Sequence, residues 1–178
     1  FVCDYSDKNT DQIIFSDHDR FEKVKTWDEG LNSSFANICE EMSPEQIEEQ
    51  FNLSEKIDYL IGHHYELPSG GNIMFGKTDA LTAIDVNTGS AKRFDTNREA
   101  IQLIAKLIKL KNISGKVVID PVASDHNTLR KLVGMLKNEF RDDLSITNVY
   151  GYTRGGLLEL SRSRNDRGID ELVFDWSF

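Results

Sequence analysis

The sequence predicts an α/β protein (α+β in its details) with a mixed sheet, and three observations support this class. Residues 81–86 are rich in β-branched side chains and end in an Asn-Thr-Gly turn at 87–89, as expected of a strand. A second apolar run at 116–119 ends in Asp120. The segment between them has the three- and four-residue spacing of a helix. This order predicts a βαβ unit with parallel strands.

Residues 1–66 are expected to form short helices with little strand. The run at 12–15 predicts a short strand followed by a helix with a loose apolar face. The clearest signal is Ser-Pro-Glu-Gln at 43–46, which combines a serine cap, a proline at the first helical position and a glutamine three residues on, as in a capping box. Another helix is expected at 55–61, whereas residues 32–42 show no period.

The central part of the chain should alternate strands with one long helix. Residues 65–67 and 73–75 flank a Pro-Ser-Gly-Gly turn, which predicts a hairpin leading into the strand at 81–86. The sequence Thr-Asn-Arg-Glu at 96–99 predicts a second capping box. The helix that it opens carries its buried stripe at Ile101, Ile104, Ala105 and Ile108.

The last third continues the same alternation. After Asp120, a helix is expected from Ser124 or Asp125, because its apolar residues recur on one face. Two further strands are expected at 146–150 and 156–160. The tail from residue 165 onward is charged and then apolar, which predicts an additional strand or helix packed on the domain.

Composition is that of an ordinary globular protein and limits binding by charge. Of 178 residues, 39% are hydrophobic and 29% charged, and no apolar run reaches the ~20 residues of a membrane span, so no membrane partner is expected. The net charge of −9 is opposite to that of a protein that holds nucleic acid by charge alone, so a nucleic-acid role would need a local site, a metal or a partner. Cys3 and Cys39 form neither a metal motif nor a disulfide framework, which favours the cytoplasm.

Polar side chains at the ends of two strands form the candidate site. Asp85 and Asn87 point to one face of their strand because strand side chains alternate, and Asp120 ends the next strand. The aspartates are 35 residues apart, as a βαβ unit requires, and the ends of such strands lie ~5–10 Å apart. Two carboxylates at this separation repel each other unless a proton or cation lies between them. Because all the potential ligands are oxygens, the site suits Mg²⁺ or Mn²⁺.

Such an ion could polarise a phosphodiester and lower the pKa of a bound water, so the chemistry indicated is phosphoryl-group hydrolysis. The alternative is that Asp85 and Asp120 only cap turns and the helices that follow, as aspartates at strand ends often do.

Longer motifs surround these residues. They are LPSGGNI at 67–73, TDALTAIDVNTG at 78–89, NREA at 97–100, VVID at 117–120 and TRGGLLELSR at 153–162. Together they resemble the catalytic core of the ribonuclease E/G family. The resemblance implies a DNase I-like domain at 67–178, and residues 1–66 are more weakly similar to part of the family's RNase H-like subdomain.

The family is one of Mg²⁺-dependent endoribonucleases that cleave single-stranded RNA, so the resemblance implies this activity in RNA processing or decay. Carried over position by position, Asp85 and Asp120 would hold the metal, and Asn87 would orient them or the phosphate. Contacts to RNA phosphates are implied for four cations, Lys92, Arg93, Arg154 and Arg162.

The sequence departs from the family pattern in three ways. The family's oligonucleotide-binding barrel and its sensor of RNA 5′ ends are not among these 178 residues, so a separate RNA-binding domain or protein is an expected partner. The cysteine pair that links subunits through zinc is missing, so no zinc-linked tetramer is expected. Ala123 stands where the family often has a second aspartate.

Two other function classes stay open. Residues 71–78 match the phosphate-binding pattern GxxxxGKT of an NTPase letter for letter, but such a loop needs turn residues between its glycines and a helix from the lysine. Here Ile73, Met74 and Phe75 predict a strand instead. The third class is a non-catalytic, RNA-associated scaffold derived from the same core, which cleavage of RNA would exclude.

Overall fold

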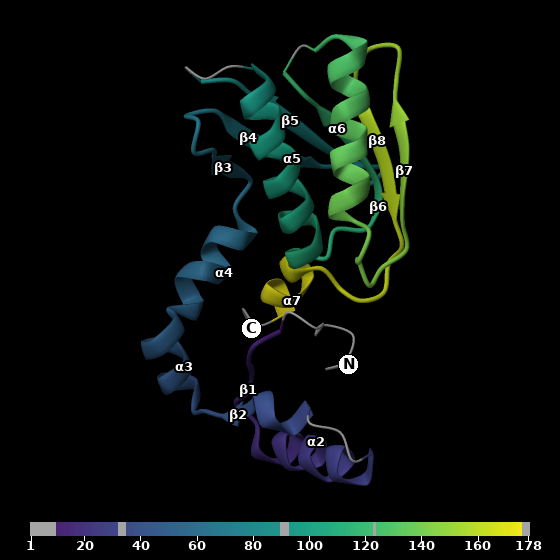
Figure 1. Cartoon of the computed structure of the whole chain (residues 1–178). Helices are drawn as coiled ribbons and strands as arrows, with labels where there is room; N and C mark the ends of the chain where they lie inside the picture. Colours follow the sequence, from purple (N-terminus) through teal and green to yellow (C-terminus); the bar gives the residue numbers. More distant parts are fainter. Residues whose placement is uncertain (1–9, 32–34, 90–92, 123, 176–178) are drawn as a thin grey trace. The chain divides into compact units, whose positions relative to one another are not determined.

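The computed structural model describes residues 10–31, 35–89, 93–122 and 124–175, and it divides into two compact units, Phe1–Ile57 and Asp58–Phe178 (Figure 1). The division falls inside helix α4 (Leu53–Ile61). The subdomain boundary expected after residue 66 stays a prediction. Within the described residues, no helix combines the length and apolarity needed to cross a bilayer.

The first unit is organised around a small apolar centre. Its elements are β1 (Ile13–Phe15), α2 (His18–Leu31), the 3-10 helix η1 (Phe35–Ile38), β2 (Cys39–Glu41), α3 (Pro44–Phe51) and the start of α4. β1 and β2 pair in parallel, and Phe15, Phe21 and Cys39 are buried between them and α2. The Asp28 carboxylate accepts hydrogen bonds from the backbone of Phe35 and Ala36, which fixes the start of η1.

The capping box predicted before α3 is confirmed. The Ser43 hydroxyl accepts a hydrogen bond from the Gln46 backbone, and the Gln46 side chain accepts one from the Ser43 backbone. Asn52, in the left-handed conformation with φ 48°, ends this helix and separates it from α4. Residues 32–42 show no period in the sequence, yet their described part contains η1 and β2. Elements of three or four residues are too short to show a period.

The second unit contains a six-stranded mixed sheet, which confirms the predicted α/β class. The strands are β3 (His64–Glu66), β4 (Asn72–Lys77), β5 (Thr82–Asn87), β6 (Gly115–Asp120), β7 (Thr147–Tyr152) and β8 (Leu158–Arg162). They lie in the order β3-β4-β5-β6-β8-β7, and only β5 and β6 are parallel. The βαβ unit of the sequence is therefore present, with its strands adjacent.

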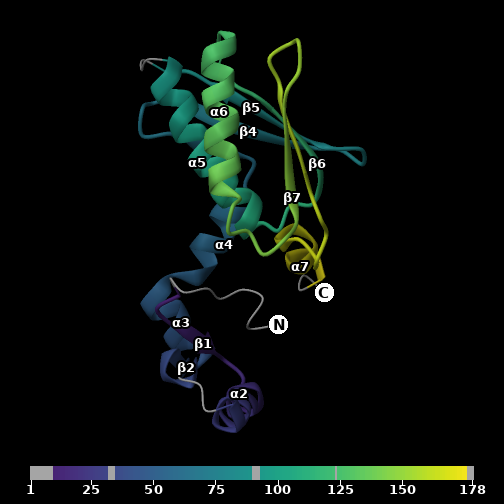
Figure 2. The same ribbon diagram turned by 45° about the vertical axis from the view of Figure 1, so that its right-hand side comes forward.

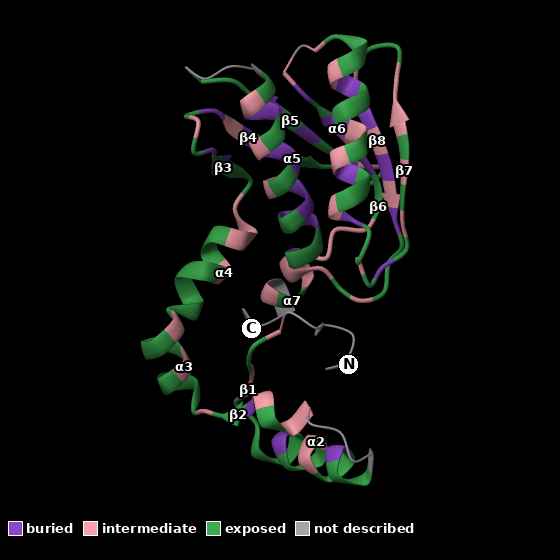
Figure 3. Cartoon of the chain, viewed as in Figure 1, coloured by how far each residue is buried: buried purple, intermediate pink, exposed green. Residues whose placement is uncertain are grey.

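Two helices, α5 (Arg93–Leu110) and α6 (His126–Glu139), cover one face of this sheet (Figure 2). Ile84 and Ile119 point toward them and are buried, whereas their neighbours Asp85 and Asp120 are exposed on the other face. Figure 3 shows buried residues both on the strands and on α5 and α6. Burial of one face fixes the register, because a slip by one residue would turn every apolar side chain outward.

The structure decides two alternatives that the sequence left open, the form of the C-terminal tail and the role of the GxxxxGKT segment. The tail forms a short helix, α7 (Ile169–Asp175), rather than a strand. The GxxxxGKT segment lies in β4, where Ile73 and Phe75 are buried and no helix starts at Lys77. That geometry excludes a phosphate-binding loop at this position.

Candidate active site at the ends of β5 and β6

The two predicted metal ligands lie side by side. Asp85 and Asp120 are directly opposed in the parallel ladder of β5 and β6, and both are exposed. Adjacent strands are about 4.8 Å apart, and the buried neighbours Ile84 and Ile119 show that both aspartates point to the same face. The carboxylates are thus within reach of one shared cation.

Asn87 belongs to the same cluster. Its Nδ2 donates a hydrogen bond of 2.8 Å to Asp85 Oδ2 and lies 3.3 Å from Asn72 Oδ1 on β4. The bond occupies one oxygen of Asp85 and fixes the carboxylate rotamer, so the other oxygen is left for a ligand. The orienting role expected of Asn87 stays a prediction.

A cleft of about 440 Å³ opens beside the two aspartates. Its walls come from the ends of β5 and β6, the loop that follows β6, the first turns of α6 and the turn between β7 and β8. The lining residues are Asp85, Val86, Asp120, Pro121, Val122, Ser124, Leu129, Gly155 and Gly156. The cleft therefore forms where the chain leaves the carboxyl ends of the parallel strands, which is where open α/β sheets bind ligands.

One wall of the cleft is held by Asn97, whose role the sequence did not indicate. Its side chain, 1% exposed on α5, accepts a hydrogen bond of 2.9 Å from the Val122 backbone. It also donates to the Val122 carbonyl and to Ser124 Oγ, both at 3.0 Å. Asn97 thus ties two residues of the short segment between β6 and α6 to α5. Its partners lie 25 and 27 residues away, so no local pattern could have found them.

The capping box predicted at 96–99 is wrong. α5 begins at Arg93, so Thr96 lies inside the helix, where it is buried. Glu99 does not fold back onto the helix start, because its Oε2 accepts a hydrogen bond of 3.0 Å from the Ser69 backbone in the β3–β4 turn.

That turn packs closely against the end of β5, and glycine is required for the approach. A Cβ on Gly89 would lie 2.0 Å from the Gly70 carbonyl oxygen, and one on Gly71 would lie 2.5 Å from the Asn87 carbonyl oxygen. Only glycine avoids these clashes. The LPSGG and NTG motifs are therefore two halves of one contact, which supports the strand end that carries Asp85 and Asn87.

Of the four cations predicted to contact RNA, only Arg154 and Arg162 have described side chains, and these two have different surroundings. Arg154 is exposed in the β7–β8 turn, next to Gly155 and Gly156 of the cleft wall. Lys92 lies outside the described residues, as does Ala123, and only the backbone of Arg93 is described, as the first residue of α5.

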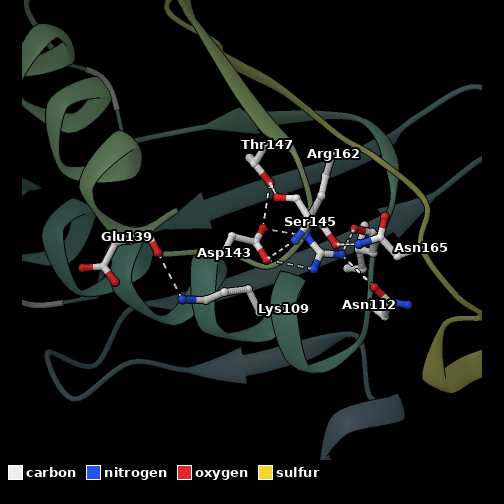
Figure 4. A network of polar contacts seen from close by, with 9 residues as sticks. Lys109, Asn112, Glu139, Asp143, Ser145, Thr147, Arg162 and Asn165 are labelled. Atoms are coloured by element: carbon white, nitrogen blue, oxygen red, sulfur yellow. Dashed lines mark hydrogen bonds and ion pairs between the residues drawn. The ribbon is translucent and has the colours of Figure 1, made fainter. Parts of the chain in front are cut away.

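Arg162 has an internal role instead (Figure 4). It is in phase with the buried Leu158 and Leu160, so it points to the helix-covered face, away from Asp85 and Asp120. Its guanidinium makes hydrogen bonds of 2.8 and 3.1 Å to the Asp143 carboxylate, and the two side chains are only 5% and 3% exposed. We therefore do not assign it an RNA contact.

The donor set fits a magnesium ion with few protein ligands. Among the described residues, no group of three or more His, Cys, Asp or Glu side chains could enclose a metal. The cluster offers two carboxylates and an amide, all exposed on one face. Mg²⁺ typically binds through one or two carboxylates and keeps several waters, so these residues suit it, whereas they lack the nitrogen or sulfur ligands of zinc.

Comparison with known proteins identifies the family. The sequence model of the ribonuclease E/G family matches residues 1–165. The chain belongs to the ribonuclease E/G family. Ribonuclease G of Escherichia coli is 26% identical over 180 residues, which cover 96% of this chain and 37% of that protein. Ribonuclease E of Haemophilus influenzae is 28% identical over 180 residues, covering 96% of this chain and 19% of that protein.

A third relative matches a shorter region. Ribonuclease E of Buchnera aphidicola is 32% identical over 130 residues, covering 68% of this chain and 13% of that protein. This member of the ribonuclease E/G family thus spans little more than a third of the length of its ribonuclease G relative. The resemblance carried by the sequence motifs is confirmed as a family relationship.

Proposed function

We propose that this chain is the catalytic core of an endoribonuclease that cleaves single-stranded RNA with Mg²⁺, or Mn²⁺ in its place. The observation that carries the proposal is the register of Asp85 and Asp120 on adjacent parallel strands. Family membership supports the substrate, because the relatives are named ribonuclease G and ribonuclease E.

Each residue of the cluster has a distinct task. Asp85 and Asp120 would hold the ion between their free oxygens, and Asn87 keeps the Asp85 carboxylate turned toward it. A bound Mg²⁺ would supply Lewis-acid polarisation of the phosphodiester and a lower pKa for the attacking water. Asn97 keeps the cleft wall at Val122 and Ser124 in place, so that the scissile phosphate is confined against the aspartates.

Arg154 supports binding of the anionic substrate. It is exposed beside the glycines that line the cleft, where a guanidinium can pair with an RNA phosphate. With a net charge of −9, the chain gains little general attraction for RNA, so we propose that a separate RNA-binding domain or protein assists it in the cytoplasm.

The test is cleavage of a fluorescent single-stranded RNA with Mg²⁺, with Mn²⁺ and with chelator. We expect cleavage inside the strand in either metal and none with chelator. An Asp120→Asn variant should lose the activity while an Asp142→Asn variant, changed at an exposed carboxylate outside the cleft, keeps it. Failure of the parent chain to cleave in both metals would favour the scaffold role.

A further inference from the structure

One side of α6 carries cations that the proposed chemistry leaves unused. Arg130 and Lys137 are seven residues apart, which places them on the same side of the helix, and Arg141 follows directly after its end. All three are exposed. Within the described part of the chain, no carboxylate forms an ion pair with any of them. We call Arg130, Lys137 and Arg141 the basic stripe.

The basic stripe runs along the outer strand of the sheet. Lys137 and Arg141 line a groove of about 440 Å³ together with residues 147–150 of β7. One turn before Arg130, the His126 ring lies 5.8 Å from the ring of Tyr152 at the other end of β7. Tyr150, between these two points, is 67% exposed, but its hydroxyl is hydrogen-bonded to Ser161 Oγ on the sheet face opposite α6. The aromatic pair beside the basic stripe is therefore His126 and Tyr152, at the end near the cleft.

This surface begins at the cleft. Ser124 and Leu129 at the start of α6 line the cleft, as do Gly155 and Gly156, which follow β7. From there α6 extends for 14 residues, about 21 Å, to the groove at Lys137. The basic stripe therefore extends along α6 from the cleft that contains the two aspartates.

The acidic groups near the basic stripe leave its charge largely intact. Asp125 caps α6 and accepts a hydrogen bond from the Thr128 backbone, and Asp143 is paired internally with Arg162. Glu139 and Asp142 lie only at its far end.

We propose that the basic stripe and the edge of β7 form a track for the RNA strand that leaves the cleft. The inference rests on the proposed function and extends it to where the substrate lies beyond the scissile bond. Phosphates would follow Arg130, Lys137 and Arg141, while the exposed His126 ring, which lies against Tyr152, offers a surface on which a base stacks. That combination is typical of surfaces that bind single strands.

Two other occupants fit the surface less well. A second copy that paired its β7 edge with this one would bring two basic stripes together, and like charges would oppose the contact. An acidic peptide could add to β7 as a strand, but the register shift between Val149 and Gly151 interrupts the ladder that such a peptide needs. Continuity with the cleft favours RNA.

The experiment measures binding without cleavage. Labelled oligouridines of about 20 and about 6 nucleotides are titrated with the full chain in chelator, and anisotropy reports the affinity, since site sizes of ~4–16 nucleotides are usual. The test variant is R130Q/K137Q/R141Q. The matched control, K56Q/K106Q/K116Q, changes the net charge equally at three exposed lysines outside the basic stripe. Circular dichroism melts verify that both variants fold.

We expect the parent and the control to bind the longer RNA about tenfold more tightly than the shorter one, because only the longer strand reaches the basic stripe. The test variant should lose this preference, and its salt dependence should be shallower by about 2 in log–log slope. A preference retained by the test variant, lost equally by the control, or missing from the parent would overturn the proposal. The proposal would also be overturned if the test variant bound RNA as the parent does but had lost binding of a polyglutamate peptide. Because the binding assay omits metal, it tests the RNA track separately from the cleavage proposed for the two aspartates.

Discussion

Asp85 and Asp120 face each other across a pair of parallel strands, and the Asn87 amide holds the first of them. Parallel pairing matters because it brings the carboxyl ends of both strands, and hence both side chains, to the same edge of the sheet. An antiparallel pair would place the end of one strand beside the start of the other. The site is thus a direct result of the βαβ connection through α5.

Asp120→Asn should leave the melting temperature equal or raise it by about 3 °C or less in metal-free, low-salt buffer. The substitution removes one of two carboxylates that repel each other, and the gain should shrink in high salt because the charges are exposed. Added Mg²⁺ should then stabilise the parent more than the variant. Thermal melts with and without Mg²⁺ check this. A marked loss of stability in the variant would show that Asp120 has a structural role instead.

Asn97→Ala should destabilise the fold by about 1–3 kcal/mol, because the Val122 backbone N–H loses its partner and the Val122 carbonyl keeps only Ser124 Oγ. Asn97→Asp should cost at least as much, since a buried carboxylate oxygen would replace the amide group that donates to the Val122 carbonyl. Urea unfolding measures both. The control is Gln102→Ala, an exposed position on the same helix, which should change stability by less than about 0.5 kcal/mol. Equal effects of the substitutions at Asn97 and Gln102 would contradict the role of Asn97 in holding the cleft wall.

Gly89→Ala should destabilise by about 1–3 kcal/mol and reduce RNA cleavage, because the new Cβ would overlap the Gly70 carbonyl and displace the end of β5. Gly134→Ala is the counterpart. It lies in α6 with nothing within 4 Å of an added Cβ, so it should stabilise by about 0.5–1 kcal/mol. Chemical denaturation of the two variants tests the contrast, and similar values would refute the close contact between the turn and β5.

Arg162→Ala should destabilise by about 3–5 kcal/mol, because the Asp143 carboxylate is left buried without its counterion. The pH dependence supplies a second test. Burial raises the pKa of Asp143, but the hydrogen bonds from Arg162 and Thr147 lower it more, so its folded value lies below the ordinary one. This stabilisation is present above the ordinary pKa and is lost as pH falls through the folded value.

In Arg162→Ala, the acid-induced loss of stability should shrink or reverse, since burial then dominates the pKa of Asp143. Urea midpoints measured from neutral to acidic pH report this. An acid profile identical to that of the parent would contradict the assigned pair.

The sequence was sufficient for the elements with strong local patterns. The β-branched strands around Asp85 and Asp120 and the apolar stripe of α5 have clear periods, and alternation predicts that Asp85 and Asn87 share one face of their strand. For Arg162, the phase with Leu158 and Leu160 indicates burial, but no sequence pattern indicates its ion pair with Asp143. Its partner Asp143 lies in a loop whose position depends on tertiary packing.

The capping box at 96–99 failed for a similar reason. Glu99 is engaged by Ser69, 30 residues away, so a local rule could not decide its role. The role of Asn97 has no local signal, because its half-buried partners Val122 and Ser124 follow β6, at the other end of the βαβ unit in the sequence. Non-local hydrogen bonds of this kind set the details of the cleft, while local periodicity sets only its frame.

The most direct measurement is titration of the metal-free chain with Mn²⁺, followed by electron paramagnetic resonance of the free ion. We predict one bound ion per chain in the parent, and at least about a tenfold loss of affinity, about 1.4 kcal/mol, in both Asp85→Asn and Asp120→Asn. The variant Asp142→Asn should bind as the parent does. A parent that binds no ion, or affinity unchanged by either substitution, would contradict a site formed jointly by these two aspartates.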